Sequence, residues 1–208
     1  MKKVWKVLNL YSGIGGNRKL WENVEVTAVE IDLEIASVYQ DFFPDDNVVI
    51  EDAHQYLLEH YNEFDFIWSS PPCPSHSRIR RYAAVGRGQN NPIYPDFNLY
   101  EEIVFLHSYF SGKFAIENVI AFYKPLIKPF EFASHWFWSN FVISKIKGIG
   151  SRCHNGGIKK LMERKGFDLS NYNVGIEKKL MLRNCVEPEL GCHILDCARK
   201  YEQKVLDV

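Results

Sequence analysis

The feature that most constrains the fold is an alternation of short apolar runs with helical patterns along the first 120 residues. Runs rich in β-branched and aromatic residues predict strands at 4–11, 25–31, 48–50, 64–69 and 114–117. Helical patterns predict helices at 17–21, 32–43, 53–61 and 97–109. Strands that alternate with helices in this way predict an α/β fold, a mostly parallel sheet with helices on both faces.

The later residues continue the pattern, with a sixth strand predicted at 136–143 and a helix at 188–202. A chain of 208 residues with 46% hydrophobic content is the size of one domain. Because it has neither a membrane-length apolar stretch nor a signal-peptide core, we expect a soluble, cytoplasmic protein. Five cysteines without Cys-x-x-Cys spacing argue against a disulfide framework or a metal site.

The charge is unevenly distributed. Residues 1–70 hold 5 basic and 13 acidic side chains, whereas residues 144–183 hold 10 basic and 3 acidic ones. Residues 71–95 contain four arginines, five prolines and no acid, which predicts a long mobile loop. The two basic stretches are either solvated faces or contacts for the phosphates of a nucleic acid, and their position beside a chemical motif favours the second interpretation.

A glycine-rich turn, Ser12-Gly13-Ile14-Gly15-Gly16, follows the first strand. Arg18 replaces the third glycine of a dinucleotide fingerprint, so the turn suits a nucleoside cofactor without a pyrophosphate. Glu30 ends the second strand, where it can accept from ribose hydroxyls, and Asp52 follows the third strand, where it can accept from an adenine amine. Each acid could instead be a helix cap or part of a solvated loop.

Two further residues follow strands at the same expected edge. Cys73 lies in Ser69-Ser70-Pro71-Pro72-Cys73-Pro74-Ser75, and Glu117 begins Glu117-Asn118-Val119. A thiolate that adds to C6 of cytosine makes C5 nucleophilic, and a carboxyl group with a raised pKa can assist at N3. The alternatives are a buried hydrophobic cysteine and a surface glutamate in an ion pair.

The order of these motifs, ending with Arg183-Asn184-Cys185-Val186, resembles that of the DNA (cytosine-5) methyltransferases. The resemblance implies a single Rossmann-like domain over 1–208 that uses S-adenosyl-L-methionine, acts on double-stranded DNA, and flips its target base out of the helix. Tyr11 would stack on the adenine where the family usually has Phe, although it could equally be a core residue. The implied cofactor contacts are Tyr11, Ser12, Gly13, Gly15, Gly16, Glu30, Ile31, Asp52, Ala53, Pro72, Leu99, Asn184 and Val186.

The implied catalytic residues are Cys73 and Glu117, and the implied DNA contacts are Ser75, Arg78, Arg80, Arg81 and Arg87. His135 occupies the position where the family has an arginine that contacts cytosine O2, and a neutral histidine donates only one hydrogen bond. Asn9 likewise stands where many members carry Asp.

The short basic insert 144–183 stands where the family has a large target-recognition region. It predicts a short or degenerate recognition sequence, or help from a specificity partner or homodimer, with no metal at Cys153-His154. Such compactness suits a phage or prophage enzyme, associated with the nucleoid of its host. Two other readings stay open: an RNA cytosine-5 methyltransferase, and a catalytically silent subunit that binds DNA or a partner.

Overall fold

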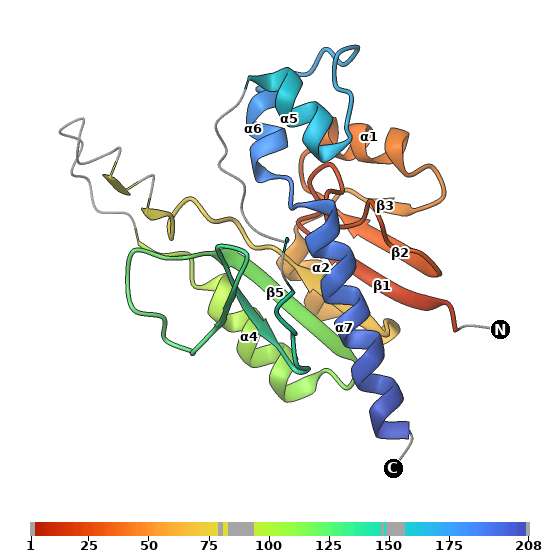
Figure 1. Cartoon of the computed structure of the whole chain (residues 1–208), viewed down its shortest axis with the longest axis vertical. Coiled ribbons are helices and arrows are strands. Elements are labelled where there is room, and N and C mark those ends of the chain that lie inside the picture. The colour runs from red at the N-terminus through yellow and green to blue at the C-terminus, as the bar shows by residue number, and fades with distance from the viewer. Residues whose placement is uncertain (1–2, 79–80, 83–93, 147, 149–156, 207–208) are drawn as a thin grey trace.

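The computed structural model describes residues 3–78, 81–82, 94–146, 148 and 157–206, and its centre is a twisted seven-stranded sheet (Figure 1). The strands are β1 (Trp5–Leu10), β2 (Val24–Val29), β3 (Asn47–Val49), β4 (Phe66–Ser69), β5 (Lys113–Val119), β6 (Phe130–Phe132) and β7 (His135–Ser139). Their order is β3-β2-β1-β4-β5-β7-β6. The first five in this order are parallel, whereas β7 runs antiparallel to β5 and β6 antiparallel to β7.

The helices connect and cover these strands. They are α1 (Leu33–Phe42), α2 (Ala53–His60), the short 3-10 helix η1 (Tyr61–Glu63), α4 (Asn98–Tyr109), α5 (Ile158–Lys165), α6 (Lys178–Asn184) and α7 (Pro188–Leu206). Asp32 caps α1 as predicted, because its Oδ1 accepts from the backbone N–H groups of Glu34 and Ile35 at 2.9 and 3.1 Å. The start of α1 could therefore be predicted from the local sequence.

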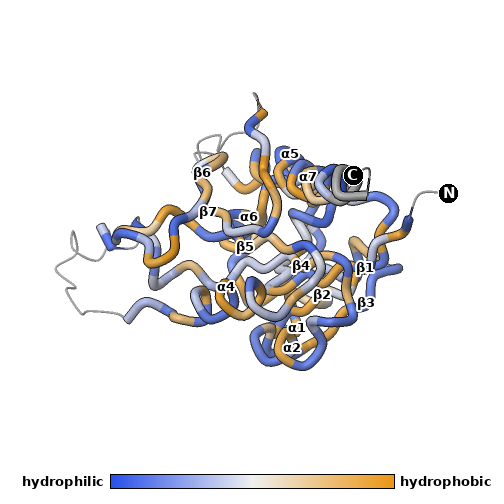
Figure 2. The backbone as a smooth tube through the Cα atoms, turned by 90° about the horizontal axis from the view of Figure 1, so that it is seen from below, coloured by the Kyte–Doolittle hydropathy of each residue, from blue (hydrophilic) through white to orange (hydrophobic). Residues whose placement is uncertain are grey.

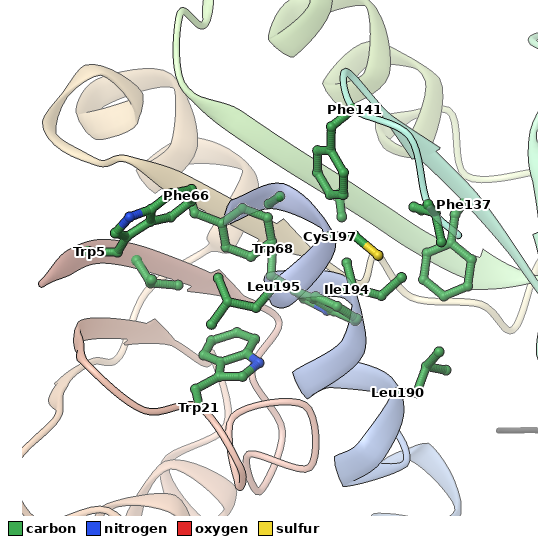
Figure 3. Packing of buried hydrophobic residues seen from close by; sticks show 14 of the residues in the cluster. Trp5, Trp21, Phe66, Trp68, Phe137, Phe141, Leu190, Ile194, Leu195 and Cys197 are labelled. Atoms are coloured by element: carbon green, nitrogen blue, oxygen red, sulfur yellow. The ribbon is translucent and has the colours of Figure 1, made fainter. Parts of the chain in front are cut away.

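Side-chain alternation along the central strands divides the core between two faces of the sheet. On one face α7 packs its apolar side against a set of aromatic residues that includes Trp21, Phe66 and Trp68 (Figure 3). On the other face α2 and α4 cover Leu8, Ile67 and their neighbours. Figure 2 shows α2 and α4 on the opposite side of the sheet from α7. A third cluster joins α1 to α5 and α6. Helices therefore cover both faces, as the sequence predicts.

Three details of these elements differ from the sequence prediction. Residues 17–21 form turns instead of a helix: the N–H groups of Lys19 and Trp21 reach carbonyls three residues back, and the Arg18 guanidinium donates to the Trp21 carbonyl at 2.9 Å. The strand predicted at 136–143 ends at Ser139, whose hydroxyl donates to the Phe141 carbonyl at 2.8 Å. Its partner β6 was not predicted; the two are joined by Ala133 and Ser134, both at positive φ.

Neither a membrane-spanning helix nor a metal-binding cluster occurs among the described residues. No described helix is both long enough and apolar enough to cross a bilayer. Within the same residues, no cluster of three or more His, Cys, Asp or Glu side chains has the geometry to hold a metal ion. Cys153 and His154 lie outside the described part of the chain.

Candidate active site

Cys73 lies in a tight turn just beyond the carboxyl end of β4. Its carbonyl accepts from the N–H groups of His76 and Ser77, both at 3.0 Å, and its side chain is half-buried. The loop is also tied to the neighbouring strand, because the Asn118 side chain donates to the Pro71 carbonyl at 2.9 Å. The backbone around the candidate nucleophile is therefore held by the strand that carries Glu117.

Glu117 lies near the end of β5, and its carboxylate is 7% exposed. Its Oε2 accepts from the Ser70 hydroxyl at 2.9 Å, and the same hydroxyl oxygen accepts from the Trp68 indole at 2.8 Å. Ser70 directly follows β4, which pairs with β5 in parallel register. The structure therefore brings the Cys73 loop and the Glu117 carboxylate to one edge, as the strand-end argument predicts.

His135 lies diagonally across from Glu117 on the antiparallel strand β7, where its backbone partner is Val119. Its Nε2 lies 3.6 Å from Glu117 Oε1, and its Nδ1 lies 2.8 Å from the Ala133 carbonyl. A carbonyl only accepts, so Nδ1 carries a hydrogen. This contact fixes the imidazole ring with Nε2 turned toward Glu117.

A second histidine follows the nucleophile turn. His76 is buried, its Nδ1 lies 2.6 Å from the Tyr123 hydroxyl, and burial lowers its pKa below that of an ordinary histidine. Its carbonyl accepts from the Phe122 N–H at 3.2 Å. The sequence reasoning missed this contact, since nothing local links His76 to the segment after β5.

The glycine turn leaves β1 through Tyr11, a non-glycine residue at φ 53°. Gly13 is also at positive φ, its N–H donates to Glu30 Oε2 at 2.9 Å, and a Cβ there would meet open space. Gly16 differs, because a Cβ would collide with Cys185 and Val186. Within this turn, Gly13 therefore leaves the backbone open, while Gly16 lets the segment after α6 approach.

The two acids predicted for the cofactor have structural roles as well. Glu30 also accepts from the Asp32 N–H at 3.1 Å, and burial raises its pKa above the ordinary value for a glutamate. Asp52 caps α2 by accepting from the Gln55 N–H at 2.9 Å. Asp52 is therefore a helix cap, the alternative to a cofactor contact. It still lies beyond the carboxyl end of β3, where a cofactor contact is predicted.

The other residues predicted at this edge differ in exposure. Ala53 and Leu99 are buried, Ile31 is 67% exposed, and Gly15 packs against α1. Three more lie at the surface or only partly covered: Pro72, Asn184 and Val186. Asn9, which stands where an acid was expected, is buried and exchanges amide hydrogen bonds with Asn17, the shorter at 2.7 Å.

Sequence reasoning missed a buried carboxylate beside the glycine turn. Glu102 on α4 is fully buried and accepts from the Tyr11 hydroxyl at 2.7 Å and the Ser69 hydroxyl at 2.6 Å. His54 Nδ1 lies 3.3 Å from the same carboxylate. The sequence offered one indication of this buried carboxylate: Glu102 lies three residues after Leu99, on the same face of the predicted helix.

The predicted nucleic-acid contacts are only partly within the described residues. Arg78 is exposed, with its Nε donating to the Ala121 carbonyl at 2.7 Å, and the Arg81 guanidinium lies 4.4 Å from the Phe122 ring centre. The Ser75 hydroxyl accepts from the Asp96 N–H at 2.9 Å. Arg80 and Arg87 lie outside the described part, as does most of the predicted loop.

Comparison with known proteins identifies the family. The sequence model of the C-5 cytosine-specific DNA methylases matches residues 5–125. The chain belongs to this family. The matched part of this C-5 cytosine methylase contains the glycine turn, Cys73 and Glu117.

Individual relatives share part of the chain. The tRNA (cytosine(38)-C(5))-methyltransferase of Spodoptera frugiperda is 35% identical over 85 residues, which cover 37% of this chain and 25% of that protein. A DNMT2 mutant structure from the same organism has a TM-score of 0.40 at 29% identity, covering 55% of this chain and 35% of the other. A SAM-dependent methyltransferase from Agrobacterium tumefaciens has a TM-score of 0.41 at 15% identity, covering 59% and 41%. The chain thus spans about a quarter of its curated relative.

The cofactor of this family is S-adenosyl-L-methionine, and the parallel strand order β3-β2-β1-β4-β5 is that of a Rossmann-like fold. The residues present fit the cofactor. The Ser12 hydroxyl is buried and has no hydrogen-bond partner among the described residues, and Gly13 opens onto unfilled space beside it. Glu30 adds a part-buried carboxylate that can accept from hydroxyl groups.

Proposed function

We propose that this chain transfers a methyl group to C5 of cytosine in DNA through a covalent bond to Cys73. The observation that carries the proposal is the joint placement of the Cys73 loop and Glu117 at neighbouring strand ends. Two hydrogen bonds connect them, Ser70 to Glu117 at 2.9 Å and Asn118 to the Pro71 carbonyl at 2.9 Å. A thiol and a carboxyl group held in this way are what addition to a cytosine ring requires.

S-adenosyl-L-methionine supplies the electrophilic methyl group. The Cys73 thiolate forms a bond from Sγ to C6, and the displaced electron pair makes C5 nucleophilic. Glu117 donates a hydrogen bond to N3 and accepts from the 4-amino group, which stabilises the charge that develops on the ring. After C5 has taken the methyl group, a base removes the C5 proton and the bond from Sγ to C6 breaks.

The contact between Glu117 and His135 supports a role for His135 in orienting the Glu117 carboxyl group. His135 Nδ1 donates toward the Ala133 carbonyl at 2.8 Å, and its Nε2 lies 3.6 Å from Glu117 Oε1. His135 thereby lies against the carboxyl group that is proposed to contact the cytosine ring.

Exposed basic groups support a nucleic-acid substrate. Arg78 and Arg81 follow the Cys73 turn, and the insert 144–183 contains α5 and α6 with further exposed cations, Lys159, Lys160 and Arg183. Part of the insert has a packing role instead, because Lys165 is buried against Glu187 at 2.8 Å. An insert as small as 144–183 can contact few bases, and we propose that a second copy of the chain or a partner protein adds sequence specificity.

One observation favours RNA as the second candidate substrate. The relative that is 35% identical over 85 residues is a tRNA (cytosine(38)-C(5))-methyltransferase. The chemistry at the ring is the same for both nucleic acids. An experiment that offers both DNA and RNA as methyl acceptors is therefore needed to identify the substrate.

The test is cytosine-methylation sequencing of DNA and of tRNA from a methylation-free bacterial host that expresses the wild type or Cys73→Ala. We expect methyl marks in DNA with the wild type and none with Cys73→Ala. Marks in tRNA alone would replace DNA by RNA as the substrate. Soluble wild-type protein without marks in either would favour a silent binding subunit.

Cys192→Ala provides the matched control, because Cys192 is a half-buried cysteine on α7 and is not among the predicted site residues. Its marks should equal those of the wild type. Methyl transfer that survives in Cys73→Ala would remove the covalent scheme.

A further inference from the structure

Glu102 is a charged residue in a place where charge is costly. It is fully buried on the face of α4 that carries Leu99, Ile103 and Leu106. Burial of a carboxylate is tolerated only when its oxygens are well satisfied. Here the Tyr11 and Ser69 hydroxyls donate to it and His54 Nδ1 lies 3.3 Å away.

These partners come from elements that are far apart in the sequence. Tyr11 begins the glycine turn after β1, Ser69 ends β4, and His54 lies in the first turn of α2. His54 directly follows Ala53 and lies two residues beyond Asp52, while Leu99 lies one turn before Glu102 on α4. The proposed adenine contacts therefore sit on the elements that the Glu102 carboxylate links together.

Tyr11 is the partner whose conformation most needs support. It is at φ 53°, a region that non-glycine residues occupy only when their surroundings hold them there. Burial and the Glu102 charge raise the pKa of Tyr11 above its ordinary value, so its hydroxyl stays protonated and donates. A charged acceptor makes this a strong hydrogen bond that fixes the direction of the ring.

We propose that Glu102 is a positioning residue of the S-adenosyl-L-methionine site, which holds the Tyr11 ring and the start of α2 in the arrangement that receives the adenine. The inference rests on the proposed contacts of Tyr11 and Asp52 with the cofactor. Glu102 acts through Tyr11 and makes no contact with the cofactor.

The test is isothermal titration calorimetry of S-adenosyl-L-methionine into the wild type, Tyr11→Phe, Glu102→Gln and the double variant. Tyr11→Phe removes the Tyr11–Glu102 hydrogen bond and Glu102→Gln replaces its charged acceptor with a neutral one, and we expect each to raise Kd by about tenfold. Because both changes act on the cofactor site through this same hydrogen bond, the double variant should bind no more weakly than the weaker single variant. Effects that simply multiply would overturn the proposal.

Ile103→Val separates positioning from general stability. Ile103 is the buried neighbour of Glu102 on α4, and its truncation lowers the melting temperature without touching the hydrogen bonds. Its Kd should equal that of the wild type. Tyr11→Phe retains the ring and removes one hydroxyl, so it folds even where Glu102→Gln does not, and a wild-type Kd in Tyr11→Phe would overturn the proposal.

The readout distinguishes this inference from the proposed function. A wild-type chain that binds S-adenosyl-L-methionine but methylates neither DNA nor RNA would count against the proposed function. The comparison of Kd between the variants would still decide the role of Glu102.

Discussion

Two buried carboxylates at the carboxyl edge of the sheet differ in how they are satisfied. Glu102 is fully buried and meets two hydroxyl donors and a histidine, while Glu117, 7% exposed, accepts one side-chain hydrogen bond among the described residues, from Ser70. Glu102 is thus committed to protein contacts. Glu117 keeps more hydrogen-bonding capacity, and under the proposed function this capacity serves the cytosine ring, whereas Glu102 serves the scaffold.

The largest effect expected from this difference is on methyl transfer. Glu117→Gln keeps the shape of the side chain but removes the acidic proton, so the rate should fall by about 100-fold or more. The melting temperature and the Kd for S-adenosyl-L-methionine should stay near those of the wild type. Single-turnover methylation assays and thermal melts measure both, and a normal rate would show that Glu117 is not the proton donor.

The opposite pattern is expected for complete removal of the other carboxylate. Glu102→Ala leaves two hydroxyls and a histidine without their acceptor, which should cost about 3–5 kcal/mol of unfolding free energy. Glu101→Ala is the matched control, because the neighbouring Glu101 side chain is 63% exposed and its ion pair with His54 is weak. Urea denaturation of both variants measures the free energy of unfolding. Equal losses in Glu102→Ala and Glu101→Ala would show that the burial of Glu102 does not make its hydrogen bonds more important.

The smallest expected effect is a pH dependence at His54. The hydrogen bond to Glu102 raises the pKa of His54 above the ordinary 6.5. The stabilisation is therefore fully present below pH 6.5 and is lost as pH rises through the raised folded-state value. Other charges that face His54 are Glu101 and Asp52, and both act in the same direction.

Thermal melts of the wild type and His54→Gln between pH 5 and 9, values chosen to span roughly the histidine range, measure this dependence. The wild type should lose more stability than the variant as pH rises. Parallel curves would show that His54 and Glu102 are not coupled.

Much of the fold was readable from the sequence because local patterns carry it. The five parallel strands, the cap at Asp32 and the long helix after Pro188 all follow from periodicity and turn chemistry. The edge strand β6 was missed, since it has three residues and its turn, Ala133-Ser134, lacks the glycine or asparagine typical of such hairpins. The same shortage of local signal produced a helix prediction at 17–21, where Arg18 stabilises turns instead.

The sequence by itself determined that Cys73 and Glu117 lie at one edge of the sheet, because Cys73 follows β4, Glu117 lies near the end of β5, and parallel strands end at one edge. Tertiary structure decided how these groups are held. The Tyr11 hydroxyl meets Glu102 across 91 residues of sequence, and Ser70 meets Glu117 across 47. Such contacts depend on strand order and register, which bring together side chains that no local pattern connects.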